Sequence, residues 1–304
     1  MGMLSVILPA YNEAENIKRA AKRTGDVLKE AGIEYELVYV NDGSTDETES
    51  EIESLADTDS HVRYVMFSRN FGKEAAISAG LAHSKGDCVA VMDCDLQHPP
   101  ETLPRMYKLW EEGYEVVEGV KSSRGKESVA HKAFAGFFYG IMSKAMGMDM
   151  RDASDFKLLD RRAVEAVLSF PEYHSFFRAL SSFVGFKKTK VDFEVQEREA
   201  GKSKWSLKAL FFYAMDNIME FSAVPMHIVT FTGIITFIFA IALGIQTLIR
   251  YFDGTAAEGF TTVIILLLFL GSILMISLGI IGMYISKIYD EVKHRPRYII
   301  SKCS

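Results

Sequence analysis

Short apolar runs alternate with longer amphipathic segments from residue 4 to about residue 119. The short runs have the length and composition of buried strands, and the segments between them carry apolar residues at helical spacing. The expected strands are Leu4–Pro9, Leu37–Asn41, Val62–Phe67, Cys88–Met92 and Glu115–Gly119. The expected helices are Ala14–Glu30, Asp46–Ala56, Lys73–His83 and Glu101–Glu112. This alternation predicts an α/β domain with a mostly parallel sheet and helices on both faces.

The last third of the chain has a different pattern. Charged residues are absent between Glu220 and Arg250, and again between Glu258 and Lys287. Each gap holds the roughly 20 apolar residues that a helix needs to cross a bilayer. The pattern predicts two membrane-spanning helices joined as a hairpin, and a pair of buried core helices is the alternative. The expected spans are residues 225–249 and 262–285.

Basic residues indicate how the hairpin is oriented. They gather in the tail and just before the first span, whereas the connecting loop carries only Arg250. Because basic residues stay cytoplasmic, we expect both termini and the large domain on the cytosolic side of the cell membrane. Residues 129–147 and 206–222 have apolar positions at helical spacing, as core helices or interfacial helices do, and for the second segment we favour an interfacial helix. The expected division is a cytosolic domain over residues 1–205, an interfacial helix over 206–223, two membrane helices within 224–286 and a basic cytosolic tail over 287–304.

Composition narrows the class of partner. The net charge of −6 over 304 residues argues against a nucleic-acid partner, for which a basic surface is usual. The three cysteines have neither zinc-site nor disulfide spacing and fit a reducing compartment. The first residues run directly into an expected strand, so we expect no signal peptide.

Polar side chains follow three of the expected strands. Asp93 and Asp95 close the run Cys88–Met92, and Tyr11–Glu13 and Asn41–Ser44 follow two others. Ligands of open parallel sheets bind beyond the carboxyl ends of the strands. Carboxylates at such an end suit Mg²⁺ or Mn²⁺ bound to a substrate phosphate, and a solvated pair in a turn is the alternative. The two glycine motifs that commonly bind phosphates, G-x-x-x-x-G-K-[ST] and G-x-G-x-x-G, are both absent from the sequence. A metal and basic side chains would therefore have to neutralise phosphates.

Together these stretches resemble the inverting family-2 glycosyltransferases of GT-A (Rossmann-like) fold. More narrowly, they are similar to the membrane-anchored polyprenyl-phosphate glycosyltransferases, which include dolichol-phosphate mannose synthases and bactoprenol glucosyltransferases. The two spans and the ending Arg295–Tyr298 resemble the bacterial branch. The Q-x-x-R-W element of polysaccharide synthases is not reproduced around residues 196–205, which argues against a processive synthase. The matching stretches are Val6–Glu13, Val40–Asp46, Asn70–Lys73, Asp93–Glu101, Ser154–Arg161 and Arg198–Trp205.

The resemblance implies a site for a nucleotide-sugar donor. Asp42 also has a structural alternative, which is to cap the helix start at Ser44–Asp46. Lys73 would lie near the base or the diphosphate. The pocket for base and ribose would comprise Pro9, Tyr11, Glu13 and Asp42, and the metal on the donor diphosphate would be held by Asp93, Asp95 and Gln97.

The resemblance also implies residues for the lipid acceptor. Asp155 would orient the acceptor or act as base; its alternative is a structural partner for Arg161 or Arg162. The acceptor phosphate would be bound by Arg124, Arg198, Ser203 and Lys204, for which a basic stripe facing anionic lipid is the alternative.

The implied activity is transfer of one hexose to a polyprenyl phosphate, undecaprenyl phosphate in the bacterial branch, with inversion. Asp95, as a metal ligand, and Asp155 would be the catalytic residues. UDP-glucose is the expected donor, and GDP-mannose, an N-acetylhexosamine or an aminopentose donor are the alternatives. A catalytically inert membrane scaffold is the competing class, and self-association through the hairpins is a further hypothesis.

Overall fold

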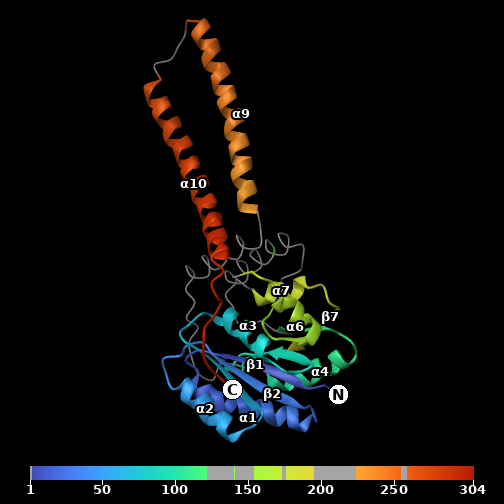
Figure 1. Ribbon diagram of the computed structural model, residues 1–304. Coiled ribbons are helices and arrows are strands. Elements are labelled where there is room, and N and C mark those ends of the chain that lie inside the picture. The colour runs from blue at the N-terminus through green and yellow to red at the C-terminus, as the bar shows by residue number, and fades with distance from the viewer. Residues whose placement is uncertain (1, 122–139, 141–153, 173–175, 195–223, 255–258) are drawn as a thin grey trace. The chain divides into compact units, whose positions relative to one another are not determined.

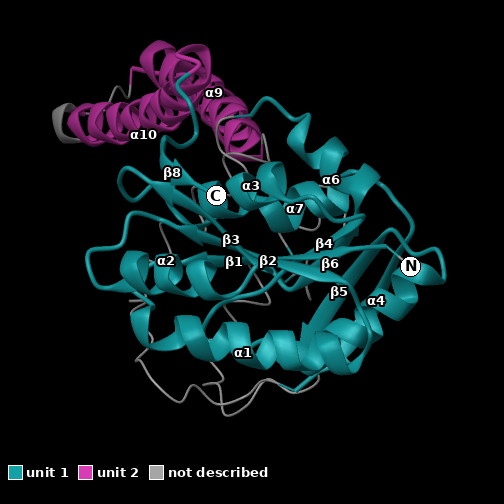
Figure 2. Cartoon of the chain, turned by 60° about the horizontal axis from the view of Figure 1, so that its bottom comes forward, with its two compact units in different colours: residues 1–206, 295–304 teal, residues 207–294 magenta. Residues whose placement is uncertain are grey.

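The computed structural model describes residues 2–121, 140, 154–172, 176–194, 224–254 and 259–304 (Figure 1). The chain forms two compact units. The first comprises residues 1–206 together with 295–304, and the second comprises residues 207–294 (Figure 2). The two predicted helical segments, residues 129–147 and 206–222, lie outside the described residues apart from Gly140.

The first unit is built on one mixed sheet. Its central strands are the apolar runs of the N-terminal half, which are parallel and buried as the alternation of strands and helices predicts. These strands are β1 (Leu4–Ala10), β2 (Tyr35–Asn41), β3 (Val62–Phe67) and β4 (Cys88–Val91). The flanking strands are β5 (Val116–Lys121), β6 (Lys157–Asp160), β7 (Lys188–Phe193) and β8 (Ile300–Cys303). The order across the sheet is β7-β5-β6-β4-β1-β2-β3-β8.

Helices cover both faces of this sheet (Figure 2). On one face lie α1 (Ala14–Glu30), α2 (Thr48–Thr58) and α4 (Leu103–Glu111), which follows the short 3₁₀ turn η1 (Pro100–Thr102). On the other face lie α3 (Lys73–His83), α6 (Arg161–Leu168) and α7 (Phe177–Phe183). The GT-A-like α/β class, with its mostly parallel central sheet, is confirmed.

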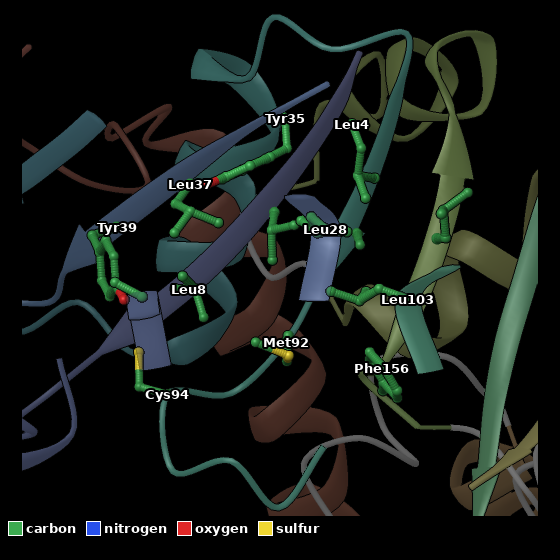
Figure 3. Close-up of a cluster of buried hydrophobic side chains, with 14 of the residues drawn as sticks. Leu4, Leu8, Leu28, Tyr35, Leu37, Tyr39, Met92, Cys94, Leu103 and Phe156 are labelled. Carbon is green, nitrogen blue, oxygen red and sulfur yellow. The ribbon is translucent and has the colours of Figure 1, made fainter. Parts of the chain in front are cut away.

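A cluster of buried hydrophobic side chains lies between the sheet and the helices α1 and α4. Leu4, Leu8 and Leu37 extend from the strands toward Leu28 of α1 (Figure 3). Tyr39 is fully buried in the same cluster, and its hydroxyl donates to the carbonyl of Ile17 at 3.0 Å. Removing such side chains from water supplies the main stabilisation of the unit. This rigid core fixes the ends of the central strands.

The C-terminal residues belong to the sheet. The predicted basic tail contains strand β8, which pairs antiparallel with β3 and forms one edge of the sheet. Tyr298 stacks on Phe67 with ring centroids 5.0 Å apart, and Arg297 donates to the carbonyl of Phe170 at 2.6 Å. Lys302 pairs with Glu49 and Glu53 of α2. The chain therefore returns to the first unit after the apolar helices.

The second unit contains two long apolar helices, α9 (Val224–Phe252) and α10 (Phe260–Val292), which contact each other. Both are long and apolar enough to cross a membrane, with mean hydropathies of 2.5 and 2.9 over their candidate spans. Their large apolar side chains are exposed within the described residues, which is unlike the core helices of a soluble protein. The predicted boundaries fall inside the two helices.

Candidate active site

Three neighbouring strands bring the predicted polar residues to one edge of the sheet. β1 lies between β2 and β4, with Ala10 opposite Asn41 and Ile7 opposite Val91. All three strands run in the same direction, so the segments after residues 10, 41 and 91 leave from the same side. This side of the sheet, beyond the strand ends, is the usual place of ligands in such folds.

A lysine bridges two carboxylates at this edge. The Lys73 ammonium lies 2.6 Å from Asp93 Oδ1 and 2.9 Å from Asp155 Oδ2. Arg178 of α7 holds Asp155 from another side, with Nε 2.6 Å from Oδ1 and Nη2 2.8 Å from Oδ2. The result is a compact cluster of two carboxylates and two cations, drawn from α3, the loop after β4, the segment before β6, and α7.

Burial disfavours the charged form of each group in this cluster, but the oppositely charged neighbours outweigh that effect. The Lys73 and Arg178 cations hold the pKa of Asp155 well below its usual range, against the effect of burial. Lys73 likewise lowers the pKa of Asp93 against burial, with a smaller contribution from His98. In turn the Asp93 and Asp155 carboxylates raise the pKa of Lys73, overcoming its desolvation. All three groups are therefore charged at neutral pH.

The acidic loop after β4 has a strained backbone. Leu96 is buried, with 3 % of its surface exposed, and adopts a left-handed φ of 58°, which is uncommon for a leucine. The turn lets the Gln97 N–H donate to Asp95 Oδ1 at 3.1 Å. Strain of this kind often marks functional sites, where the surrounding structure maintains it. The hydrogen bond from Gln97 to Asp95 fixes the backbone between these two residues.

His98 supports the same loop and was not singled out from the sequence. It stacks on Phe156, with ring centroids 4.9 Å apart, and its Nδ1 accepts from the Asp93 N–H at 3.3 Å. Burial lowers the pKa of His98, which fits a neutral ring with an unprotonated Nδ1. His98 therefore positions the Asp93 backbone.

Asp42 anchors the turn that carries Lys73. Its carboxylate accepts from the N–H groups of Phe71 and Gly72, at 2.6 Å and 2.9 Å. Gly72 has a φ of 98°, which favours glycine, and it immediately precedes α3. The alternative of a cap for the helix start at Ser44–Asp46 is not what the structure has: α2 begins at Thr48, with no side-chain hydrogen bond at its N-cap. Asp42 connects β2 to the start of α3 instead.

The other predicted donor residues lie on the segment after β1. Tyr11 is exposed (48 %), and Glu13 directly precedes α1, with its carboxylate accepting from the Asn16 amide at 2.6 Å. The Pro9 carbonyl accepts from the Cys94 thiol at 3.3 Å, which ties β1 to the acidic loop. Cys94 belongs to the buried cluster below (Figure 3). The structure thus gathers Pro9, Asp42, Lys73 and the acidic loop around adjoining strand ends.

The alternative prediction, that Asp155 is a structural partner of Arg161 or Arg162, is wrong. Arg161 instead donates to the carbonyls of Ser84 and Gly86, and Arg162 pairs with Asp160 and Glu115. Both follow β6 in the chain, whereas Asp155 precedes that strand. Its partner Arg178 comes from α7, which sequence spacing does not reveal. The predicted acceptor residues Arg124, Arg198, Ser203 and Lys204 lie outside the described residues.

A buried ion pair lies beneath Arg178. Lys157 is fully buried, and its ammonium donates to Glu118 Oε1 and to Ser181 Oγ, both at 2.8 Å. The same ammonium donates to the Arg178 carbonyl at 3.3 Å. Burial lowers the pKa of Lys157, and the Glu118 carboxylate opposes that change. These bonds fix α7 against β5 and β6 and thereby set the position of Arg178.

The acidic loop has the donor set of a divalent-cation site. Among the described residues no group of three or more His, Cys, Asp or Glu side chains forms a ready cage. Mg²⁺ needs only one or two carboxylates when water and substrate phosphates complete its shell. The Lys73 ammonium shows that a cation is accommodated beside Asp93, at 2.6 Å. The residues present therefore fit such a metal.

Comparison with known proteins places these features in a family. The model of Glycosyl transferase family 2 matches residues 5–168. A Bacillus subtilis protein, CsbB, which carries the name of a glycosyltransferase, is 41 % identical over 100 % of this chain and 92 % of its own length. A bactoprenol glucosyl transferase of Shigella flexneri is 36 % identical, covering 98 % of this chain and 97 % of that protein.

Solved structures agree on the fold. Glucosyl-3-phosphoglycerate synthase of Mycobacterium tuberculosis, in complex with Mn²⁺, UDP and phosphoglyceric acid, has a TM-score of 0.54 at 21 % identity. The match covers 72 % of this chain and 76 % of that one. With the fold, the strand-end site and the family match in agreement, the chain belongs to glycosyl transferase family 2 and is a glycosyltransferase.

Proposed function

We propose that this protein transfers a single glucose from UDP-glucose to a polyprenyl phosphate at the cytosolic membrane face, with inversion at the anomeric carbon. The observation that carries the proposal is similarity over nearly the whole chain, both apolar helices included, to proteins named bactoprenol glucosyl transferases. The charged cluster at the strand ends supports it, because a diphosphate leaving group requires nearby cations.

In this reaction an oxygen of the acceptor phosphate attacks the anomeric carbon. The bond from that carbon to the donor diphosphate breaks, and its electron pair leaves with the diphosphate. A divalent cation held by Asp93, Asp95 and Gln97, Mg²⁺ or Mn²⁺, would stabilise the charge on that leaving group. The acceptor is a phosphate monoester with a second pKa of about 6, so its oxygen is already anionic at neutral pH.

This chemistry decides the role that we propose for Asp155. A group whose pKa is held far below its usual range by Lys73 and Arg178 is a poor proton acceptor. The acceptor phosphate does not require one. For Asp155, orienting the acceptor is therefore favoured over acting as general base, and its carboxylate also holds Lys73 at the site.

The remaining assignments follow the donor and the lipid. Pro9, Tyr11, Glu13 and Asp42 would surround base and ribose, with the exposed Tyr11 ring available for stacking on the base. Arg124, Arg198, Ser203 and Lys204 would bind the acceptor phosphate, since guanidinium and ammonium groups suit its oxygens. A hairpin of α9 and α10 would keep the enzyme beside a lipid that leaves the bilayer only at a cost of about 0.8 kcal/mol per CH₂ group.

A donor panel tests the proposal. Purified full-length protein in detergent is incubated with undecaprenyl phosphate, Mg²⁺ or Mn²⁺, and one radiolabelled donor at a time: UDP-glucose, GDP-mannose, UDP-N-acetylglucosamine or a UDP-aminopentose. We expect label in the lipid fraction with UDP-glucose and none after chelation of the metal. Label from another donor would correct the sugar, and no lipid label from any donor would support the inert-scaffold alternative.

A further inference from the structure

Lys73 contacts both Asp93 and Asp155, so it affects how a metal would bind to Asp93. Lys73 Nζ is 2.6 Å from Asp93 Oδ1, a residue that we assign to the metal. The charge of the Asp93 carboxylate is therefore balanced by the Lys73 ammonium. A divalent cation on the same carboxylate would meet an ammonium a few ångströms away. Two cations at such a short separation repel each other, and a divalent ion doubles the charge product.

The cluster has a second cation, Arg178. Its guanidinium contacts Asp155 through two bonds, from Nε to Oδ1 and from Nη2 to Oδ2. Asp155 thus keeps a partner if Lys73 leaves. Among the described residues, His98 also lies beside the Asp93 carboxylate, with Nδ1 3.9 Å from Oδ2. This nitrogen accepts from the Asp93 N–H, as a neutral ring does. Loss of Lys73 would leave Asp93 in need of a cation.

Lys73 is also able to move. It is the first residue of α3, its side chain is 42 % exposed, and four methylene groups separate its ammonium from the backbone. By contrast the Asp93 backbone is fixed by His98, and the turn before Lys73 is fixed by Asp42. The Lys73 side chain is therefore the part of this cluster that can change position.

We propose that Lys73 is a resident counter-cation, which holds Asp93 in the metal-free protein and is displaced from it when the divalent metal binds. This inference rests on the proposed metal role of Asp93 within the proposed function. Lys73 then competes with the metal and lowers its affinity. The Lys73 contact keeps the acidic loop ordered before the metal and donor arrive. Without this cation between them, the Asp93 and Asp155 carboxylates would repel each other.

Metal affinity measures this competition without any transfer reaction. Mn²⁺ binding to full-length protein in detergent is followed by electron paramagnetic resonance, with neither nucleotide-sugar nor lipid present. We expect Lys73→Met, which keeps an unbranched side chain one atom shorter and removes its charge, to bind Mn²⁺ about tenfold or more tightly than wild type. Lys73→Arg keeps the charge and should not show this gain.

The matched control is Lys302→Met, which removes a lysine that also bridges two carboxylates, Glu49 and Glu53, at the sheet edge. Its Mn²⁺ affinity should equal that of wild type. Equal or weaker Mn²⁺ binding by Lys73→Met overturns the proposal, because a merely structural lysine would lower the affinity when removed. If neither wild type nor Lys73→Met binds Mn²⁺, the metal role and this inference both fail, whereas the donor panel judges sugar transfer independently.

A structure of the wild-type protein with Mn²⁺ gives a second measurement, which does not depend on the variant folding. We expect the metal on Asp93 and Lys73 Nζ beyond hydrogen-bond distance of Asp93 Oδ1. Metal on Asp93 with the 2.6 Å contact intact would overturn the proposal.

Discussion

Asp155 lies between two cations, and both contacts limit what its carboxylate can do. Lys73 and Arg178 together make three bonds to its two oxygens. A carboxylate in this state remains ionised over the whole physiological range and orients its neighbours rather than exchanging protons. Asp93 and Asp95 differ from it because they lie in the loop after β4, where a donor diphosphate would meet them.

Replacing Asp95 by Asn tests the metal assignment. The substitution keeps the size of the side chain and removes the negative charge that would attract a divalent ion. We expect sugar transfer to fall by about a hundredfold or more, as for loss of an electrostatic contribution of several kcal/mol. The assay is lipid-linked label per minute, and thermal unfolding followed by tryptophan fluorescence should be unchanged.

The control for this variant is Asp57→Asn, which removes an exposed carboxylate from α2 and should leave transfer unaffected. Normal turnover by Asp95→Asn would remove Asp95 from the metal site.

Glu74 provides a test by pH. Burial, followed by the nearby Asp155 charge, raises its pKa from 4.5 to about 7. Between these values the folded protein keeps the Glu74 proton and the unfolded chain has lost it, so this group makes stability fall as the pH rises from 4.5 to 7. Glu74→Gln keeps an acceptor for the Phe177 N–H and has no proton to lose. Because Glu74 is partly exposed, we expect the variant to gain about 1–2 kcal/mol relative to wild type between pH 5 and pH 8.

Unfolding in urea at both pH values, followed by tryptophan fluorescence, measures this difference. Glu112→Gln, at an exposed position at the end of α4, is the control and should follow the wild-type profile. An equal pH dependence in Glu74→Gln and wild type would contradict the assignment of a raised pKa to Glu74.

Some residues of this site can be predicted from the sequence, and others cannot. Asp42, Lys73, Asp93 and Asp95 follow strand ends or belong to continuous motifs, so their proximity can be predicted from parallel strands alone. Arg178 comes from a helix far along the chain and meets Asp155 only through tertiary packing. His98 lies within the acidic motif, but its role depends on stacking with Phe156, which no local pattern reveals.

At the scale of elements, the central strands and their helices match the predicted ranges closely. Ala14–Glu30, Lys73–His83 and Val62–Phe67 agree at both ends, because apolar periodicity and burial coincide there. The short strands β6, β7 and β8 were not predicted. Each has four to six residues, and half or more of the residues of β7 and β8 are exposed, so pairing with neighbouring strands defines them rather than an apolar pattern.

The C-terminal strand allows a test at this scale. Tyr298→Ala removes the ring that stacks on Phe67, an interaction worth about 1 kcal/mol beyond its buried area. We expect the β3–β8 pairing to open more often, with amide hydrogen exchange in residues 300–303 about fivefold faster. Mass spectrometry of peptides from the exchanged protein measures the rates.

Ile299→Ala is the matched control, since Ile299 is 52 % exposed and its backbone carbonyl still accepts from the Ser68 N–H. Unchanged exchange in Tyr298→Ala would show that the stacking does not hold β8.

At the scale of the whole molecule, the chain combines an α/β transferase unit with two candidate membrane helices. The absence of charge from each apolar stretch predicts these helices directly, and their ends extend beyond the predicted spans because α10 continues into the polar residues up to Val292. Which side of the membrane each end faces is a prediction from the basic residues alone.

Cysteine labelling tests this orientation. Cys303 is exposed, whereas Cys88 and Cys94 are buried, so wild type reports the C-terminal side. Asp253→Cys in a Cys303→Ser background reports the connection between α9 and α10. A membrane-impermeant maleimide added to intact cells should label the Asp253→Cys variant and should label wild type only after permeabilisation. The reverse pattern would contradict the cytosolic placement of the transferase unit.

The most direct test of the central claim is the mass of the lipid product. Full-length protein is incubated with undecaprenyl phosphate, UDP-glucose and Mg²⁺, and the extracted lipid is analysed by mass spectrometry. We predict undecaprenyl phosphate that has gained one hexose, with an equal amount of UDP released. Release of UDP with unmodified lipid, or lipid carrying several hexoses, would contradict transfer of a single sugar to the polyprenyl phosphate.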